Sequence, residues 1–285
     1  MTKKILLTLT TLILVILPFL VGIPIGQYSP YVDSNSFKTY VIIWTAISLV
    51  FVVVALAVSK YYKQSFGSLL VSGLLLFLLI CPIIGITGLA AAPDLSIKML
   101  EHPEREHLRY IFLFLAALLF GTFPLVLLKR NSLEIKNVAR LIMTLLFILA
   151  FVESIWEFTH HYLYPEALKE WIDHGNHAEE FGKSYDNLTV ITIVAVGRLI
   201  HFSLVIWLSI QLYRLQHIKL WSPILTILFS LVGLASAIVI YITQMNIPKG
   251  FEILFLFFIP GIPFLLLYWL GVGIVTKVKK SEVAV

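Results

Sequence analysis

The sequence has little charge and almost no cysteine. Only 13% of its 285 residues are charged, whereas about a quarter of the residues of a soluble domain carry charge. Its single cysteine, Cys81, lies in an apolar run, which excludes a disulfide framework. Low-complexity linkers and a separate soluble domain are also lacking. These absences exclude an ordinary soluble globular protein.

Apolar residues dominate the chain instead. They make up 59% of it, and the mean hydropathy is +0.95. A run of about 20 apolar residues is long enough to cross a bilayer as a helix. We therefore expect an all-α integral membrane protein, a bundle of eight transmembrane helices that forms one polytopic domain over residues 1 to 285. The predicted spans are 5 to 22, 39 to 58, 68 to 91, 109 to 128, 141 to 158, 188 to 213, 220 to 243 and 251 to 275.

Two of these runs have distinctive ends or interruptions. The first follows "MTKK" and is not followed by a small-x-small cleavage site, so we expect it to be retained as a helix. The eighth contains "IPGIP" at residues 259 to 263. Because proline lacks a backbone N–H and clashes with the preceding turn, we expect the eighth helix to bend or break there.

The basic residues orient the predicted spans. If the N-terminus is inside, thirteen of the 21 Lys and Arg residues fall in cytoplasmic segments and seven fall outside. The positive-inside rule therefore places both termini in the cytoplasm. The net charge of +5 follows from this asymmetry and gives no reason to expect a nucleic acid partner. We expect a multi-pass protein of the plasma (inner) membrane, with the lipid bilayer as its principal partner.

The outer side of the predicted bundle gathers most of the histidines. Six of the eight lie in or beside two outer segments, 92 to 108 and the larger extracytoplasmic loop at 159 to 187. Residues 153 to 180 alone contain four histidines and seven acids. This convergence of titratable groups predicts a functional site that faces outward.

The fifth predicted helix carries part of this histidine cluster on one face. Glu153, Glu157 and His160 follow i, i+4 and i+7 spacing, and His161 is the next neighbour on that face. Glu153 is expected about 7 Å below the outer end of the helix. An unpartnered carboxylate at that depth is costly, so Glu153 is expected to have a partner.

Several residues on this side have the spacing of metal ligands. Glu-x-x-His lets one helix give a metal both a carboxylate and an imidazole, and it occurs in "EFTH" and "EREH". Mixed imidazole and carboxylate ligands suit copper, zinc, iron or manganese. We therefore expect a divalent transition metal, with copper, zinc or iron suspected first. The predicted ligands are Glu104, His107, Glu157, His160, His161, His174 and His177.

One part of this set resembles a known copper motif. Glu157, His161 and His174 form Glu-x3-His-x12-His. This pattern is similar in spacing to the Asp-x3-His-x12-His copper motif in the membrane part of the particulate methane and ammonia monooxygenases. The resemblance covers 18 of the 285 residues, with Glu in place of Asp, and implies that this spacing can hold copper.

The sixth predicted helix carries a charge deep in the bilayer. Arg198 is expected about 15 Å from the outer end, close to the midplane, with His201 one turn further in. A guanidinium at that depth needs a carboxylate, a backbone carbonyl, an anion or water as partner. Glu153 is the nearest acid by depth. We therefore assign Glu153, Arg198 and His201 to catalysis or proton transfer beside the predicted metal.

The sequence leaves three classes of function open. The first is metal-dependent chemistry or metal handling at the outward-facing His/Glu site, with or without enzymatic activity. The second is a proton-coupled transporter, or a sensor of pH or ligand, that uses Glu153, Arg198 and His201. The third is a membrane assembly scaffold whose outer loop binds another protein. The metal content of the purified protein separates the first class from the other two.

Overall fold

The computed structural model describes residues 97 to 129 and 133 to 276, together with scattered positions between 5 and 53. The predicted spans at 5 to 22 and 39 to 58 are described only at some of their positions. The predicted span at 68 to 91 lies outside the described residues, as does Cys81.

The described part of the chain is helical and contains no strand. Three helices, α5, α8 and α9, are long and apolar enough to cross a membrane. These findings confirm the all-α prediction for the described residues and indicate a lipid bilayer as their environment. The described elements of the continuous part are η1 (Ile97–Glu101), α4 (Pro103–Lys129), α5 (Asn137–Tyr162), α6 (Tyr164–Asp173), α7 (Ala178–Tyr185), α8 (Leu188–Arg214), α9 (Trp221–Thr243), α10 (Ile253–Phe258) and α11 (Gly261–Val275).

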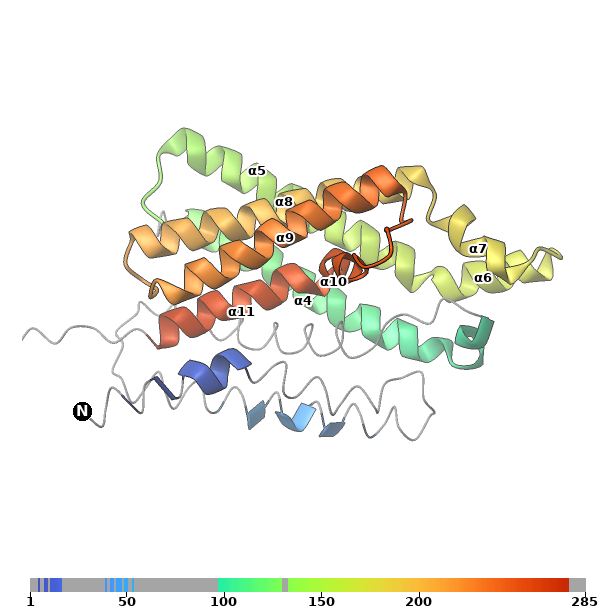
Figure 1. Ribbon diagram of the computed structural model, residues 1–285, viewed down its shortest axis with the longest axis horizontal. Coiled ribbons are helices and arrows are strands. Elements are labelled where there is room, and N and C mark those ends of the chain that lie inside the picture. The colour runs from blue at the N-terminus through green and yellow to red at the C-terminus, as the bar shows by residue number, and fades with distance from the viewer. Residues whose placement is uncertain are drawn as a thin grey trace, which may run out of the picture.

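Helix α8 is the centre of the described bundle. Asn187 directly precedes the helix, and its side chain caps it by accepting hydrogen bonds from the backbone N–H groups of Thr189 and Val190. Helix α8 packs against α5 on one side and against α9 and α11 on the other. Figure 1 shows α5, α8, α9 and α11 running along the long axis of the molecule. In contrast, α5 exposes much of its apolar surface, as expected for a helix that faces lipid.

Helix α9 packs against its neighbours through small residues. Ser222, Thr226, Ser230 and Gly233 recur at helical spacing and are buried. Ser222 donates to the Trp269 carbonyl oxygen of α11, whereas Gly233 faces α8. A Cβ atom at Gly233 would lie 2.2 Å from Cζ of Phe202 on α8. The glycine therefore lets the aromatic ring pack directly against the α9 backbone.

The break predicted in the eighth span is confirmed. Helix α10 ends at Phe258, Ile259 is extended, and α11 begins at Gly261. Because Pro260 offers no N–H, the helix does not continue across this point. The interruption leaves the Phe258 carbonyl free to accept a hydrogen bond from a side chain.

The segment at 159 to 187, expected as a loop, is mostly helical. Helices α6 and α7 pack together at one end of the molecule, where η1 also contacts α6 (Figure 1). Met99, Tyr164, Leu168 and Phe181 form a small apolar core between these three elements. This cap covers the end of α5 at which the predicted histidine cluster lies.

Candidate functional site

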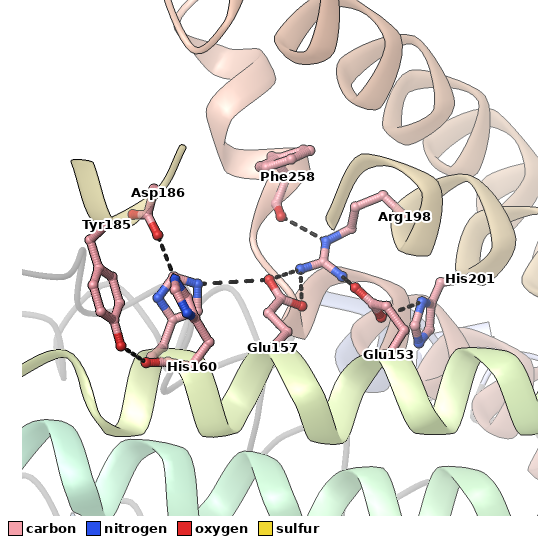
Figure 2. A network of polar contacts seen from close by, with 9 residues as sticks. Glu153, Glu157, His160, Tyr185, Asp186, Arg198, His201 and Phe258 are labelled. Atoms are coloured by element: carbon pink, nitrogen blue, oxygen red, sulfur yellow. Dashed lines mark hydrogen bonds and ion pairs between the residues drawn. The ribbon is translucent and has the colours of Figure 1, made fainter. Parts of the chain in front are cut away.

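A buried ion pair joins α5 to α8 at the centre of the site. The Arg198 guanidinium donates to both carboxylate oxygens of Glu157, with a separation of 2.6 Å to Oε2. Its Nε donates to the carbonyl oxygen of Phe258 at 2.8 Å, using the acceptor freed by the helix break. Figure 2 shows Arg198 between these groups. Arg198 is 1% exposed and Glu157 2%, so the pair is sequestered from water.

A second carboxylate lies on the other side of Arg198. Oε1 of Glu153 is 3.8 Å from the guanidinium Nη1, and Oε2 is 3.6 Å from Nδ1 of His201. Neither oxygen accepts a hydrogen bond from the described part of the chain. Glu153 is 9% exposed. A buried carboxyl group without a hydrogen-bond donor is costly as an anion.

His201 has an acceptor at each ring nitrogen. Nδ1 lies 2.8 Å from the carbonyl oxygen of Gly197, and Nε2 lies 3.0 Å from the hydroxyl of Ser154. The same hydroxyl lies 2.9 Å from the carbonyl oxygen of Ala150, to which it can donate its hydrogen. Nε2 can therefore either accept the Ser154 hydrogen or donate a proton of its own. His201 can gain or lose a proton without losing a hydrogen-bond partner.

Gly197 makes room for Glu153. A Cβ atom at this position would lie 2.1 Å from both Cδ and Oε1 of Glu153. Glycine is therefore required for the carboxyl group to rest against the α8 backbone next to Arg198. The sequence signal for this contact was the glycine directly before Arg198 in "VGRLIH".

A row of titratable groups extends from Glu157 along α5 to the end of this helix that α6 and α7 cover. Nε2 of His161 is 4.0 Å from Oε1 of Glu157, and Nε2 of His160 is 2.9 Å from Oδ1 of Asp186 (Figure 2). The phenol of Tyr185 donates to the carbonyl oxygen of His160 at 2.8 Å. Burial, followed by the charge of Asp186, raises the pKa of Tyr185 to about 12, so its phenol stays a neutral donor.

A cavity of about 440 Å³ opens beside this row. Glu157 lies in its wall, whereas Glu153 and His201 do not. Most of the wall is apolar and comes from α4, α8 and the α10–α11 break. Its polar and titratable lining residues are Glu106, Arg109, Tyr110, Glu157, His161, Tyr164 and Asp186.

A separate ion pair lies on the α4 side of the cavity. Nη1 of Arg109 is 3.2 Å from Oε2 of Glu106, and both side chains are buried. Burial raises the pKa of the Glu106 carboxyl group, while the charge and hydrogen bond of Arg109 oppose this shift. Arg109 thus compensates Glu106 locally, and the two add little net charge to the wall.

The structure divides the predicted metal ligands among different partners. His107 pairs with Glu166, with 2.8 Å between Nε2 and Oε1, while His160 pairs with Asp186. Nδ1 of His174 lies 2.7 Å from its own helix's Glu170 carbonyl oxygen. His174, His177 and Glu104 are exposed.

Within residues 97 to 129 and 133 to 276 and the scattered earlier positions, no group of three or more His, Cys, Asp or Glu residues is arranged to hold a metal ion. The metal site therefore stays a prediction. Elemental analysis of the protein purified without a polyhistidine tag, with His161→Ala as control, is its test.

Several residues of the site were not identified from the sequence. Ser154 and Asp186 contact the predicted residues but belong to no recognisable motif, and Gly197 is marked only by its place directly before Arg198. Glu106 and Arg109 form an i, i+3 pair on α4 that resembles many solvated helix ends. Their burial becomes evident only when α4, α8 and the α10–α11 break enclose the cavity.

Comparisons with known proteins give no match: no family model, no curated protein and no solved structure matches the chain.

Proposed function

We propose that the protein is a proton-coupled membrane transporter whose proton is held by Glu153. The single observation that carries this proposal is the position of Arg198 between two buried carboxylates, of which only Glu157 receives its hydrogen bonds. Ionisable residues within membrane helices commonly mark transport pathways and proton relays.

The charge balance of the site supports a bound proton. With neutral imidazoles, Glu153, Glu157 and Arg198 carry one negative charge in excess. Such a charge, buried and without a donor, costs several kcal/mol. One proton on Glu153 removes it. Nδ1 of His201 lies 3.6 Å from Oε2 of Glu153, and its ring contacts the rings of Phe120 and Phe264, so His201 is the imidazole that neighbours this proton.

Arg198 provides a means of coupling. When Glu153 is protonated, the guanidinium donates its carboxylate hydrogen bonds to Glu157 alone, as in the structure. When Glu153 loses its proton, it competes for the same guanidinium from 3.8 Å away. Glu157, in the cavity wall, then loses part of its counter-ion. Deprotonation of Glu153 thereby changes the charge that the cavity offers to a solute.

Broken helices beside a buried charged site are a feature of many transporters. The α10–α11 break supplies the Phe258 carbonyl to Arg198 and also lines the cavity. A movement of Arg198 would therefore change both the hydrogen bond at the break and the wall of the cavity.

We further propose the complete arrangement expected from the sequence: eight spans, both termini cytoplasmic, in the plasma (inner) membrane.

The test uses inside-out membrane vesicles that hold a pH gradient reported by a quenched amine dye. Organic cations, organic anions, zwitterions and inorganic ions are added one class at a time. We expect one class to dissipate the gradient in wild-type vesicles but not in Glu153→Gln vesicles. Vesicles with Glu179→Gln, an exposed acid on α7, should behave as wild type. Identical responses of wild-type and Glu153→Gln vesicles to every class would contradict the proposal.

A further inference from the structure

We propose that the cavity binds an organic cation with an apolar body, and that Glu157 is its counter-ion. This inference rests on the proposed function and names the class of solute that the transporter carries. It follows from the size of the cavity, the chemistry of its wall and the position of Glu157 in that wall.

The size and the wall suit a small apolar molecule. A volume of about 440 Å³ lies within the range of roughly 300 to 1,000 Å³ that small-molecule sites occupy. Val190, Ile191 and Val194 of α8 line one side, and Phe255 and Leu256 of α10 also contribute. These side chains offer dispersion contacts and exclude water, but they make no hydrogen bonds. They therefore select for an apolar body.

The charged part of the wall favours a cation. Glu106 is balanced by Arg109, which leaves Glu157 and Asp186 as the other acids of the lining. His161 is the remaining basic side chain there. Glu157 shares Arg198 with Glu153, so the two acids together have one guanidinium. A positive solute in the cavity compensates the same excess charge as the proton on Glu153.

Aromatic side chains add a second preference for positive charge. Tyr110, Tyr164 and Phe258 line the cavity, and Tyr110 stacks on His161 with 5.6 Å between the ring centroids. The faces of aromatic rings attract cations, and more strongly where water is excluded. Arg198 itself lies 5.7 Å from the centre of the Phe258 ring. Burial, together with the charge of Asp186, raises the pKa of Tyr164 to about 12, so this ring stays neutral.

The probe is tetraphenylphosphonium, a permanent cation with an apolar body, and its counterpart is tetraphenylborate, an anion of the same shape. Equilibrium dialysis of the purified protein in detergent measures the binding of each. We expect the wild type to bind the phosphonium in preference to the borate. Equal binding, or a preference for the borate, would overturn the inference.

Two matched pairs of variants locate the binding. Leu256→Trp fills the cavity from α10, whereas Ile253→Trp adds the same ring to an exposed position outside the lining of the same helix. Asp186→Asn removes one charge from the wall and keeps an oxygen for His160, while Glu180→Gln removes an exposed acid elsewhere. We expect the first member of each pair to weaken phosphonium binding by about tenfold or more. Leu256→Trp does so because its ring occupies the space of the ligand, and Asp186→Asn does so because a unit charge within the wall attracts the cation at short range.

The second member of each pair should leave binding unchanged. If neither Leu256→Trp nor Asp186→Asn weakens phosphonium binding, the phosphonium binds outside the cavity, and the inference is overturned. Because tetraphenylphosphonium carries no exchangeable proton, its binding tests the class of ligand apart from the proton step. A protein that binds no phosphonium, but whose vesicles respond to another solute class through Glu153, would refute this inference and leave the proposed transport intact.

Discussion

Gly197 and Glu153 are in direct contact across the α5–α8 interface, because the glycine leaves the space that the carboxyl group occupies. A Cβ atom there would lie 2.1 Å from Oε1 of Glu153. Gly197→Ala should therefore push the carboxyl group away from Arg198 and His201. We expect a loss of stability of about 1 to 3 kcal/mol, typical of overpacking, measured by thermal unfolding in detergent.

A double-mutant cycle checks this cause. In a Glu153→Ala background the clash is removed, so Gly197→Ala should cost much less there than in the wild type. Gly182→Ala is the matched control, because a Cβ at that helical position meets only the Tyr164 hydroxyl at 3.5 Å. If the cost of Gly197→Ala is the same in both backgrounds, the glycine serves helix packing and not the position of Glu153.

The second prediction concerns Arg198. Arg198→Leu leaves Glu157 and the Phe258 carbonyl without their common donor and removes the guanidinium that lies 3.8 Å from Glu153. Breaking a buried ion pair from one side costs about 3 to 5 kcal/mol, which should appear as a large fall in the unfolding temperature. Arg214→Leu, at the exposed end of the same helix, should have little effect. Equal stabilities of the two variants would mean that the buried network contributes nothing to the fold.

The third prediction concerns the dependence of cation binding on pH. A proton on Glu153 and a cation beside Glu157 compensate the same excess charge, so each should oppose the binding of the other. The affinity for tetraphenylphosphonium should therefore fall as the pH is lowered. Glu153→Gln should remove most of this dependence, because the amide cannot exchange a proton. Affinity that is constant over the pH range in the wild type would show that the two charges are not coupled.

The fourth prediction concerns orientation. After Cys81→Ala, a cysteine at Ser184 on α7 should react with an impermeant thiol reagent on intact cells. A cysteine at Gln216, in the turn between α8 and α9, should react only after the cells are opened. Both positions are exposed, so access to the reagent depends on the side of the membrane. The opposite labelling would reverse the proposed topology.

The sequence predicted the long described helices well, because their apolar runs are set by bilayer thickness. The spans expected at 188 to 213 and 220 to 243 agree closely with α8 and α9. The break at Pro260 was predicted for a local reason, the missing N–H, which needs no knowledge of the packing. The depths of Glu153 and Arg198 along their helices likewise predicted that the two side chains are neighbours, and they lie 3.8 Å apart.

The partners of the individual side chains were less predictable. Depth alone favoured Glu153 for Arg198, but the guanidinium donates to Glu157, one turn closer to the C-terminal end of α5. Glu153 rests against α8 at Gly197 and Arg198 is also held by the Phe258 carbonyl, and neither contact follows from spacing along one helix. Similarly, α6 places His174 at its exposed C-terminal end, where it contacts the Glu170 carbonyl oxygen.

The fifth prediction tests the central claim, that Glu153 holds a proton. The C=O stretch of a protonated carboxyl group is separate from the bands of a carboxylate, so infrared difference spectroscopy of the purified protein can detect it. We expect wild-type protein at neutral pH to show a protonated carboxyl band that is lost in Glu153→Gln and kept in Glu179→Gln. A wild-type spectrum without such a band, or one in which the band survives Glu153→Gln, would contradict the account.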